Sequence, residues 1–430
     1  MKSSKSLPEI KSKEFNKRPS STNMELKRPG SSQSILSNES MDIPNEFKSY
    51  DQCKGVFKYR IKYNPDCIQQ TGSLTSVVYN YNGNYVASAS TNSSVCIYKY
   101  RYKPRSLEKD KSNLYDWNWK YSRELIGHNN TITNVRWGAK CNNEMSKLMG
   151  GETQLLITSS KDNTARLWSL NKTDPLLVFK FIHGTPKSHQ LNSKTFPHGS
   201  IFTYEIKDAS LFYQNHFIAL LHHNKLYFYR YLIQKQEAGS VKPHQNNNKY
   251  KITTSYTTDA QYFTAFSCIN NNLSHLLLTA SSDKSINIYD ANVNKNILCI
   301  PNASKGKPIH SITLADYDTP CSTFHDGFLT CSINDSIRWW DIRTQHNVRV
   351  FEGHSHSKYP LRCSISPCGR YISSGSEENG YYIWDVRTSN TLAKVSGGHT
   401  DAVMDIAFNP RFAELATASI DGKVRFFTEK

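Results

Sequence analysis

The sequence predicts an all-β protein in which seven four-stranded antiparallel sheets form one closed ring. Three observations favour this architecture. One strand-turn-strand pattern returns seven times, its spacing approaches that of a four-stranded sheet, and a strand near the amino terminus can complete the last sheet. Such a ring is a seven-bladed β-propeller, in which each sheet is a blade and closure leaves no sheet edge open.

Composition divides the 430 residues into a tail and one folded domain. Residues 1–48 form a basic tail rich in Ser, Lys, Pro and Asn. This tail is predicted to be disordered, because it cannot bury enough apolar surface to offset its conformational entropy. The chain is 37% hydrophobic and 12% aromatic, so residues 49–430 can bury a continuous core as the propeller domain.

Charge and cysteine usage bound the class of protein. The net charge of +17 fits either an anionic partner or solvated Lys- and Asn-rich loops. The ten cysteines are scattered without a Cys-x-x-Cys pair and are expected to be reduced. No apolar run approaches the roughly 18 residues that cross a bilayer, and the polar start lacks a secretory signal. These features predict a cytoplasmic or nuclear protein without membrane insertion.

The repeated pattern has three parts. A strand ends in small and hydroxyl-bearing side chains, an acidic or Asn turn follows, and a second strand ends in an aromatic residue. Five copies are clear and two, the first and third, are weaker. The copies are residues 84–98, 155–168, 216–229, 276–289, 327–340, 370–384 and 414–427.

The spacing of the aromatic ends agrees with one blade per copy. From Tyr98 to Phe427, successive aromatic ends are 70, 61, 60, 51, 44 and 43 residues apart. The last two intervals match a blade of about 40 to 45 residues. The longer intervals need insertions, and polar stretches marked by Gly, Pro or Asn are predicted as loops at residues 102–120, 139–152, 183–199 and 233–249.

Four segments resemble the WD-repeat family: "GHNNTITNVRW" at 127–137, "WDIRT" at 340–344, "WDVRT" at 384–388 and "GHTDAVMDIAFNP" at 398–410. The resemblance covers the chain from about residue 54 to the end and is most specific in the last three units. Within the family, residues 329–427 are similar to the carboxyl-terminal part of the group of WD repeat-containing protein twenty-seven.

The resemblance implies a buried hydrogen-bond network in the second and seventh units. In the second unit Asp162 would accept from His128, His128 would meet a strand hydroxyl, and that hydroxyl would meet the Trp168 indole. The hydroxyl is expected from Ser160 or Thr158. The seventh unit would use His399, Ser419 and Asp421, with Phe427 in the Trp position.

Ring closure is predicted from residues 55–63, "GVFKYRIKY", which alternate strictly between apolar and basic side chains. The last copy supplies only three strands of a blade. Pairing residues 55–63 with the strand at 423–427 would complete the blade and cover its edge. Both ends of the folded domain would then share one sheet.

No catalytic or cofactor motif stands out in the sequence. Gly-x-Ser-x-Gly, Gly-x-Gly-x-x-Gly, the phosphate-binding Gly-Lys-Ser/Thr and His-Glu-x-x-His do not occur, and no Cys or carboxylate cluster has metal-ligand spacing. The expected function is therefore a non-catalytic scaffold that binds other proteins, as a monomer within a larger complex, with no catalytic, cofactor or metal residues. By the geometry of the repeat, its partner rim would include Asn130, Lys161, Ser282, Glu377, Asp401 and Ile420.

Two alternatives stay open. The boxes "WDIR" and "WDVR" resemble the Trp-Asp-x-Arg signature of substrate receptors of cullin-RING ubiquitin ligases, which makes Arg343 and Arg387 candidate contacts to the ligase adaptor. Arg is also common after Trp-Asp in such repeats. The second alternative is nucleic-acid binding by residues 99–123, where eight basic residues against three acidic ones are interleaved with aromatic residues. Those aromatic residues could instead pack on the propeller side.

Overall fold

The computed structural model describes residues 61–63, 68–101, 118–140, 154–180, 204–233, 249–270, 274–315, 327–411 and 413–429. The predicted tail at 1–48 lies outside these residues. So do residues 55–60 of the predicted closing strand and most of the four predicted loops.

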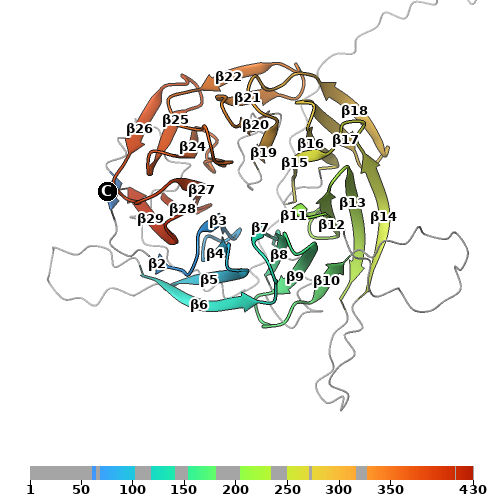
Figure 1. The fold of residues 1–430 in the computed structure, drawn as a ribbon, viewed down its shortest axis with the longest axis horizontal. Coiled ribbons are helices and arrows are strands. Elements are labelled where there is room, and N and C mark those ends of the chain that lie inside the picture. The colour runs from blue at the N-terminus through green and yellow to red at the C-terminus, as the bar shows by residue number, and fades with distance from the viewer. Residues whose placement is uncertain are drawn as a thin grey trace, which may run out of the picture. The chain divides into compact units, whose positions relative to one another are not determined.

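Seven antiparallel sheets surround a central axis, as Figure 1 shows. Six of them have four strands in chain order from the axis outwards, and the seventh is completed on its outer side by two short strands from the start of the described chain. Blades 1 to 3 contain β3 (Leu74–Tyr79), β4 (Tyr85–Ser90), β5 (Ser94–Arg101), β6 (Asn118–Ile126), β7 (Ile132–Trp137), β8 (Leu155–Ser160), β9 (Thr164–Ser169), β10 (Leu177–Lys180), β11 (Ile206–Phe212), β12 (Phe217–His222), β13 (Lys225–Leu232) and β14 (Lys249–Thr257).

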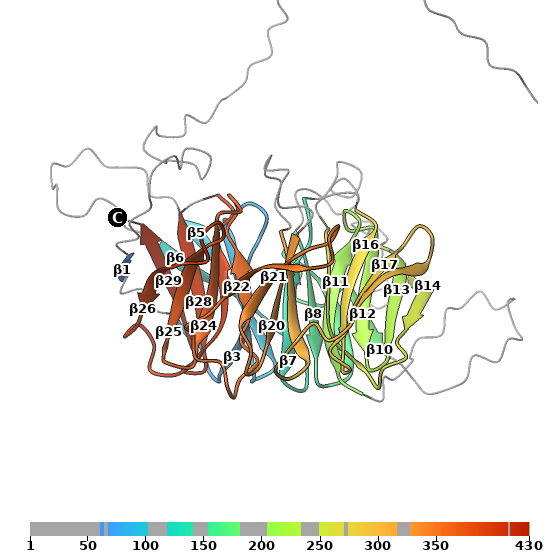
Figure 2. The ribbon, with the colours of Figure 1, turned by 90° about the horizontal axis from the view of Figure 1, so that it is seen from above.

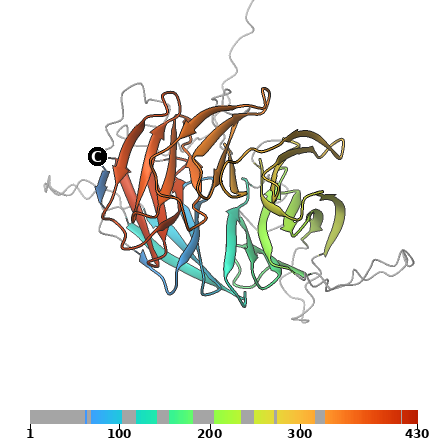
Figure 3. The ribbon, with the colours of Figure 1, turned by 45° about the horizontal axis from the view of Figure 1, so that its top comes forward.

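Blades 4 to 6 follow in the same order around the ring (Figure 3). They contain β15 (Phe263–Cys268), β16 (Leu276–Ser281), β17 (Ile286–Asp290), β18 (Lys295–Ile300), β19 (Ile309–Leu314), β20 (Gly327–Ser332), β21 (Ile337–Asp341), β22 (Asn347–Phe351), β23 (Cys363–Ile365), β24 (Tyr371–Ser376), β25 (Gly380–Asp385) and β26 (Thr391–Val395). The seven-bladed prediction is thus confirmed, and each predicted copy spans the second and third strands of one blade. The loops predicted at 102–120 and 233–249 are wrong at their ends, because β6 already begins at Asn118 and β14 at Lys249.

The core lies between neighbouring blades. In blades 2, 5, 6 and 7 every residue of the second strand is buried, as in β8 and β28. Such strands are covered on both faces because each blade is packed between two others, which explains their small and β-branched side chains. Figure 2 views the ring from its side and shows the blades standing next to one another.

Blade 7 confirms the predicted closure. It contains β27 (Val403–Phe408), β28 (Glu414–Ser419) and β29 (Lys423–Glu429). On the outer side of β29, β1 (Ile61–Tyr63) pairs with Phe427 to Glu429, and β2 (Ile68–Gln69) pairs with Lys423 and Val424. Two short strands therefore complete this blade, where one continuous strand was predicted. The part of that prediction at residues 55–60 remains untested.

A buried carboxyl group lies at the seam between blades 7 and 1. Glu414 at the start of β28 accepts hydrogen bonds from the Tyr79 hydroxyl at 2.5 Å and the Trp119 indole at 3.0 Å, both of blade 1. Trp119 also stacks on Phe426 with ring centroids 4.9 Å apart. Burial raises the pKa of Glu414 to about 7, although these donors favour the ionised form.

Glu414→Gln is expected to flatten the pH dependence of stability. The unfolded carboxyl ionises near 4.5 and the folded one near 7, so wild-type stability falls as the pH rises from 4.5 to 7. The glutamine variant should lie within about 1 kcal/mol of wild type near pH 5 and exceed it by up to roughly 3 kcal/mol at pH 8. Urea unfolding at pH 5, 6.5 and 8 measures this difference. Glu352→Gln, at an exposed carboxylate, is the control, and parallel profiles for Glu414→Gln and wild type would contradict the prediction.

Candidate functional site

A pocket in the central channel, here called the waist, is lined in part by one repeated position of the first strands. In six blades the first strand has a β-bulge, and the residue after it is Ala265 in blade 4 and Ser311 in blade 5. In the other four blades this residue is polar and joins one network: Ser76, Asn134, Asp208 and Asp405. A bulge turns one side chain out of the alternating pattern, so these polar groups reach the axis while their neighbours stay in the apolar core.

These four side chains form a chain of hydrogen bonds from blade 7 to blade 3. Ser76 donates to Asp405 Oδ2 at 2.8 Å, and the Val77 N–H donates to the same oxygen at 2.9 Å. Asn134 Nδ2 donates to Asp208 Oδ1 at 2.5 Å. Ser76 Oγ lies 3.3 Å from Asn134 Oδ1 and joins the two halves.

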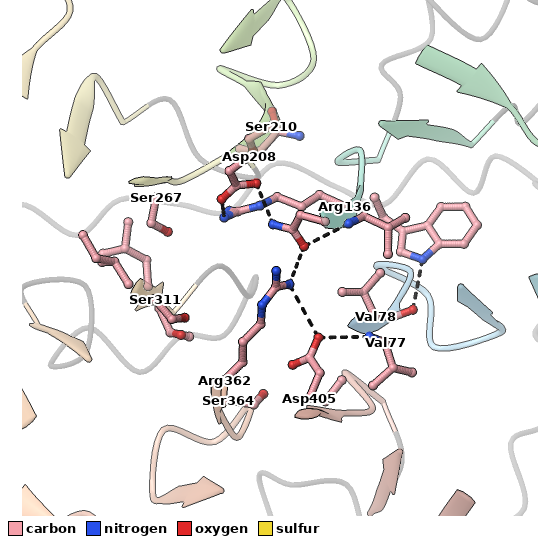
Figure 4. Close-up of a pocket in the computed structure, with 18 of the residues that line it drawn as sticks. Val77, Val78, Arg136, Asp208, Ser210, Ser267, Ser311, Arg362, Ser364 and Asp405 are labelled. Carbon is pink, nitrogen blue, oxygen red and sulfur yellow. Dashed lines mark hydrogen bonds and ion pairs between the residues drawn. The ribbon is translucent and has the colours of Figure 1, made fainter. Parts of the chain in front are cut away.

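Arg362, which directly precedes β23 of blade 6, crosses the channel (Figure 4). Its Nη1 donates to Ser76 Oγ at 3.0 Å and to Asn134 Oδ1, and its Nη2 donates to the Thr133 carbonyl oxygen at 2.9 Å. Nη1 also lies 3.7 Å from Asp405 Oδ2. One side chain of blade 6 thereby contacts blades 7, 1 and 2 at once.

A second guanidinium, that of Arg136, pairs with the Asp208 carboxylate. Arg136 Nη2 donates to Asp208 Oδ2 at 2.5 Å and to the Phe266 carbonyl oxygen at 3.2 Å, and the group lies over the Phe266 ring. Burial raises the pKa of Asp405, while Arg362 and the donors Ser76 Oγ and the Val77 and Ile406 N–H groups oppose that rise. Arg136 pairs with Asp208, and Arg362 lies beside Asp405, so each guanidinium has a carboxylate of opposite charge next to it. We call these two pairs the brace, because they link side chains of different blades across the channel.

The cavity at the waist has a volume of about 420 Å³. Its lining runs from Asp405 and Arg362 to the residues that follow the first strands, such as Asn80 and Ala139. The sequence analysis missed this site. Its signal was present, because "ITNVRW", "IKDASLF" and "VMDIAF" each place an Asn or Asp at the third position of a first strand.

The predicted His network of blade 2 is present, with Thr158 as its hydroxyl. His128 Nδ1 lies 2.9 Å from Asp162 Oδ2 and His128 Nε2 lies 2.7 Å from Thr158 Oγ1. Trp168 Nε1 donates to the same Thr158 Oγ1 at 2.9 Å. Of the two hydroxyls that the sequence offered, Thr158 is therefore the member of the network and Ser160 is not. Because Ser160 ends β8 at the turn, its hydroxyl donates to the backbone carbonyls of Asn130 and Thr131, whereas Thr158 lies deeper, level with the indole.

In blade 7 the hydroxyl of the network is likewise the threonine, Thr417, and not the predicted Ser419. His399 contacts Asp421 at 3.1 Å and Thr417 Oγ1 at 2.7 Å. Ser419, which was predicted for the network, donates instead to the Asp401 carbonyl oxygen at 3.1 Å.

Thr158→Val is expected to lower the free energy of unfolding by about 1–3 kcal/mol. Valine keeps the shape, but His128 and the Trp168 indole lose their shared buried partner. Thr417→Val should cost less, because Phe427 has no N–H to leave unpaired. Parallel urea titrations of both variants and wild type measure the difference. Equal losses at the two positions would refute a contribution from the indole.

The six predicted rim residues lie at one edge of the ring, because the first strand of an antiparallel pair begins where the second ends. Two precede first strands and four follow second strands: Asn130 and Asp401, then Lys161, Ser282, Glu377 and Ile420. Asn130 and Lys161 are exposed, and the other four are half-buried.

Glu377 is hydrogen-bonded to the backbone of the loop before β23. Its Oε1 accepts the N–H groups of Ser357, Lys358 and Tyr359 at 2.9, 2.6 and 2.9 Å. Although burial opposes the shift, these backbone donors lower the pKa of Glu377 to about 2. This carboxylate therefore braces the loop before β23, which leaves it less available to a partner.

Arg343 and Arg387 lie at the opposite edge, in the turns after β21 and β25. In each turn the N–H of the arginine donates to the preceding aspartate at 2.8 Å, Asp341 or Asp385. The Arg343 side chain is 72% exposed, and Arg387 is exposed as well. The two arginines thus occupy equivalent backbone positions on neighbouring blades.

Comparison with known proteins agrees with this architecture. The family model described as "WD domain, G-beta repeat" matches residues 65–99, 119–169, 345–385 and 390–428. The chain is 25% identical to the Denticleless protein homolog of Gallus gallus over 71% of its length and 42% of the relative. Against the Denticleless protein homolog of Danio rerio the identity is 25%, over 74% of the chain and 46% of the relative.

A shorter match is more similar. The U5 small nuclear ribonucleoprotein 40 kDa protein of Bos taurus is 37% identical over 18% of the chain and 22% of the relative. The chain spans less than half the length of each of these relatives. The likeness of residues 329–427 to WD repeat-containing protein twenty-seven is not confirmed by these comparisons and stays a prediction.

The matched segments fall on blades 1, 2, 6 and 7 and on the edge of blade 5, and the intervening blades repeat the same four-stranded arrangement. Among the residues that the structure describes, no helix is long and apolar enough to cross a bilayer. Family model, repeat pattern and closed seven-bladed ring agree: the chain belongs to the WD-repeat β-propeller family.

Proposed function

We propose that this propeller is a non-catalytic scaffold whose rims bind other proteins. The observation that carries the proposal is the pairing of charges at the waist. Arg136 with Asp208 and Arg362 with Asp405 satisfy one another inside the channel, so the ring is braced from within. The exposed side chains at the two edges are then not needed to hold the ring together and can contact a partner. Loops on a rigid scaffold commonly serve binding in this way.

A finer candidate is a substrate receptor of a cullin-RING ubiquitin ligase. It is favoured by the equivalent positions of Arg343 and Arg387 on neighbouring blades and by the exposure of both side chains. Two planar guanidiniums on one edge suit bidentate bonds to carboxylates of an adaptor.

Nucleic-acid binding has weaker support. Lys99 and Lys120 are opposite one another in blade 1, and Tyr121 is 59% exposed, so a basic and aromatic surface is present. Trp119, however, is buried against Phe426 and cannot stack on a base. This matches the alternative in which the aromatic residues pack on the propeller.

Affinity purification from the native cell, followed by mass spectrometry, tests both protein-binding candidates. Wild type is compared with the double variant Arg343→Glu/Arg387→Glu and with Arg349→Glu, a control on the exposed outer strand β22. A ligase receptor should retain adaptor and cullin subunits in wild type and in the control, and lose them in the double variant.

The scaffold proposal has its own arm in this experiment. The variants Lys161→Glu and Asn130→Ala change exposed side chains of the opposite rim. Partners that depend on either rim but include no ligase subunit would support the scaffold and remove the ligase candidate. A partner list unchanged by both rim variants would contradict binding through the rims.

A further inference from the structure

We propose that Cys331 and Cys363 are an oxidisable thiol pair that can cross-link blade 5 to blade 6. Cys331 lies in β20 and Cys363 in β23, and their Sγ atoms are 2.8 Å apart. Both are free thiols in the structure. A disulfide bond is about 2.05 Å long, so the sulfur atoms need to approach by only about 0.8 Å.

The surroundings of the pair hold the two thiols together. Cys331 and Cys363 are 1% and 5% exposed and belong to the apolar cluster between blades 5 and 6, with Leu329, Trp339 and Ile365. Each thiol comes from a different sheet, and both strands are fixed by backbone pairing to their neighbours. The contact is therefore set by the packing of two blades and does not depend on a mobile loop.

The two thiols differ in access. Cys363 borders the channel cavity, whereas Cys331 lies behind it in the interface. Burial, and then the neighbouring Cys363, raises the pKa of Cys331 well above that of an ordinary thiol. A small oxidant that enters the channel would meet Cys363 first, and Cys331 would act as the resolving thiol.

With hydrogen peroxide as oxidant, the reaction balances in two steps. The Cys363 sulfur attacks one peroxide oxygen, the O–O bond breaks, and hydroxide leaves and takes the thiol proton as water. Cys363 is then a sulfenic acid. The Cys331 sulfur attacks the sulfenic sulfur, the S–S bond forms, the S–O bond breaks, and hydroxide leaves with the Cys331 proton as a second water.

The bond would tie consecutive blades through a closed loop of residues 331–363. Cross-linking two positions restricts the unfolded chain, so the oxidised protein should melt at a higher temperature than the reduced protein. This inference is independent of the proposed function.

The test uses the full-length wild-type protein treated with hydrogen peroxide. Free thiols are then alkylated with N-ethylmaleimide under denaturing conditions, and peptides are mapped by mass spectrometry. Cleavage after Arg362 and Arg370 leaves Cys363 and Cys368 on one peptide, so fragmentation must assign the linked sulfur. The expected product is a Cys331–Cys363 peptide two hydrogens lighter than its reduced parts, lost on treatment with dithiothreitol, together with a melting temperature several degrees higher.

Two buried cysteines serve as internal controls. Cys96 and Cys268 should remain alkylatable, and Cys331→Ala or Cys363→Ala should each abolish the cross-link and the gain in melting temperature. The inference is overturned if Cys363 advances to sulfinic acid while Cys331 stays a free thiol. It is also overturned if neither reacts under conditions that oxidise the exposed Cys299. Both results come from wild type, so they hold even if an alanine variant fails to fold.

Discussion

A chain that begins at residue 71 is expected to be insoluble or to lack a cooperative melting transition. It has lost β1 and β2, so the whole outer side of β29 becomes an open sheet edge. It has also lost Gln70, whose N–H donates to the Gly422 carbonyl and whose side chain donates to the Tyr98 hydroxyl at 2.5 Å. An exposed edge invites pairing with other chains, and the seam between blades 7 and 1 loses its cover.

The matched control is a chain that begins at residue 46. It keeps both closing strands and should melt within about 2 °C of the full-length protein, since it removes none of the described contacts. The measurements are the soluble fraction after expression, the elution volume in size-exclusion chromatography, and thermal unfolding followed by circular dichroism. A chain from residue 71 that is soluble and melts cooperatively near the full-length temperature would show that closure by these strands is dispensable.

Asp405→Ala is expected to cost about 3–5 kcal/mol of unfolding free energy. The carboxylate accepts from Ser76 Oγ and from the N–H groups of Val77 and Ile406, and it lies near Arg362. Alanine leaves three buried donors and one guanidinium without this acceptor. Asp405→Asn should recover part of the loss, because its amide oxygen still accepts a hydrogen bond.

The control for Asp405 is Ser311→Ala, at the corresponding position after the bulge in blade 5. It should change the free energy by less than about 0.5 kcal/mol. A double-mutant cycle adds Arg362→Ala, and the double variant should cost less than the two single variants together by about 0.5–3 kcal/mol. Urea unfolding followed by tryptophan fluorescence measures the four proteins of the cycle and the Ser311→Ala control. Strictly additive losses for Asp405→Ala and Arg362→Ala would show that the two residues stabilise the fold independently, and this result would contradict the brace.

Several features of the fold could be predicted from local sequence, because each depends on residues that lie close together along the chain. The alternation and terminal aromatic of residues 155–168 predict β8 and β9, and the same reasoning holds for residues 414–427. The number of blades follows from counting such stretches, and closure follows from the missing fourth strand of the last one. His128 and Asp162 were found because their spacing matches the family pattern.

Other features could not be read along the chain. Ser160 and Thr158 lie on the same face of β8, and only the depth of the Trp168 indole decides which hydroxyl it meets. Glu377 looked like a rim residue, yet the path of the loop before β23 brings three N–H groups to it. In both cases the partner is set by how strands stack, which a linear pattern does not contain.

The sequence by itself determined the class of fold, the seven blades and the residues that end their strands, because hydrophobic periodicity and turn chemistry act over a few residues. Only the tertiary structure decided which side chains meet across the axis. Arg362 contacts Asn134, 228 positions earlier, and Asp405 contacts Ser76, 329 positions earlier, because ring closure makes distant blades neighbours. The same packing of separate sheets brings Cys331 against Cys363.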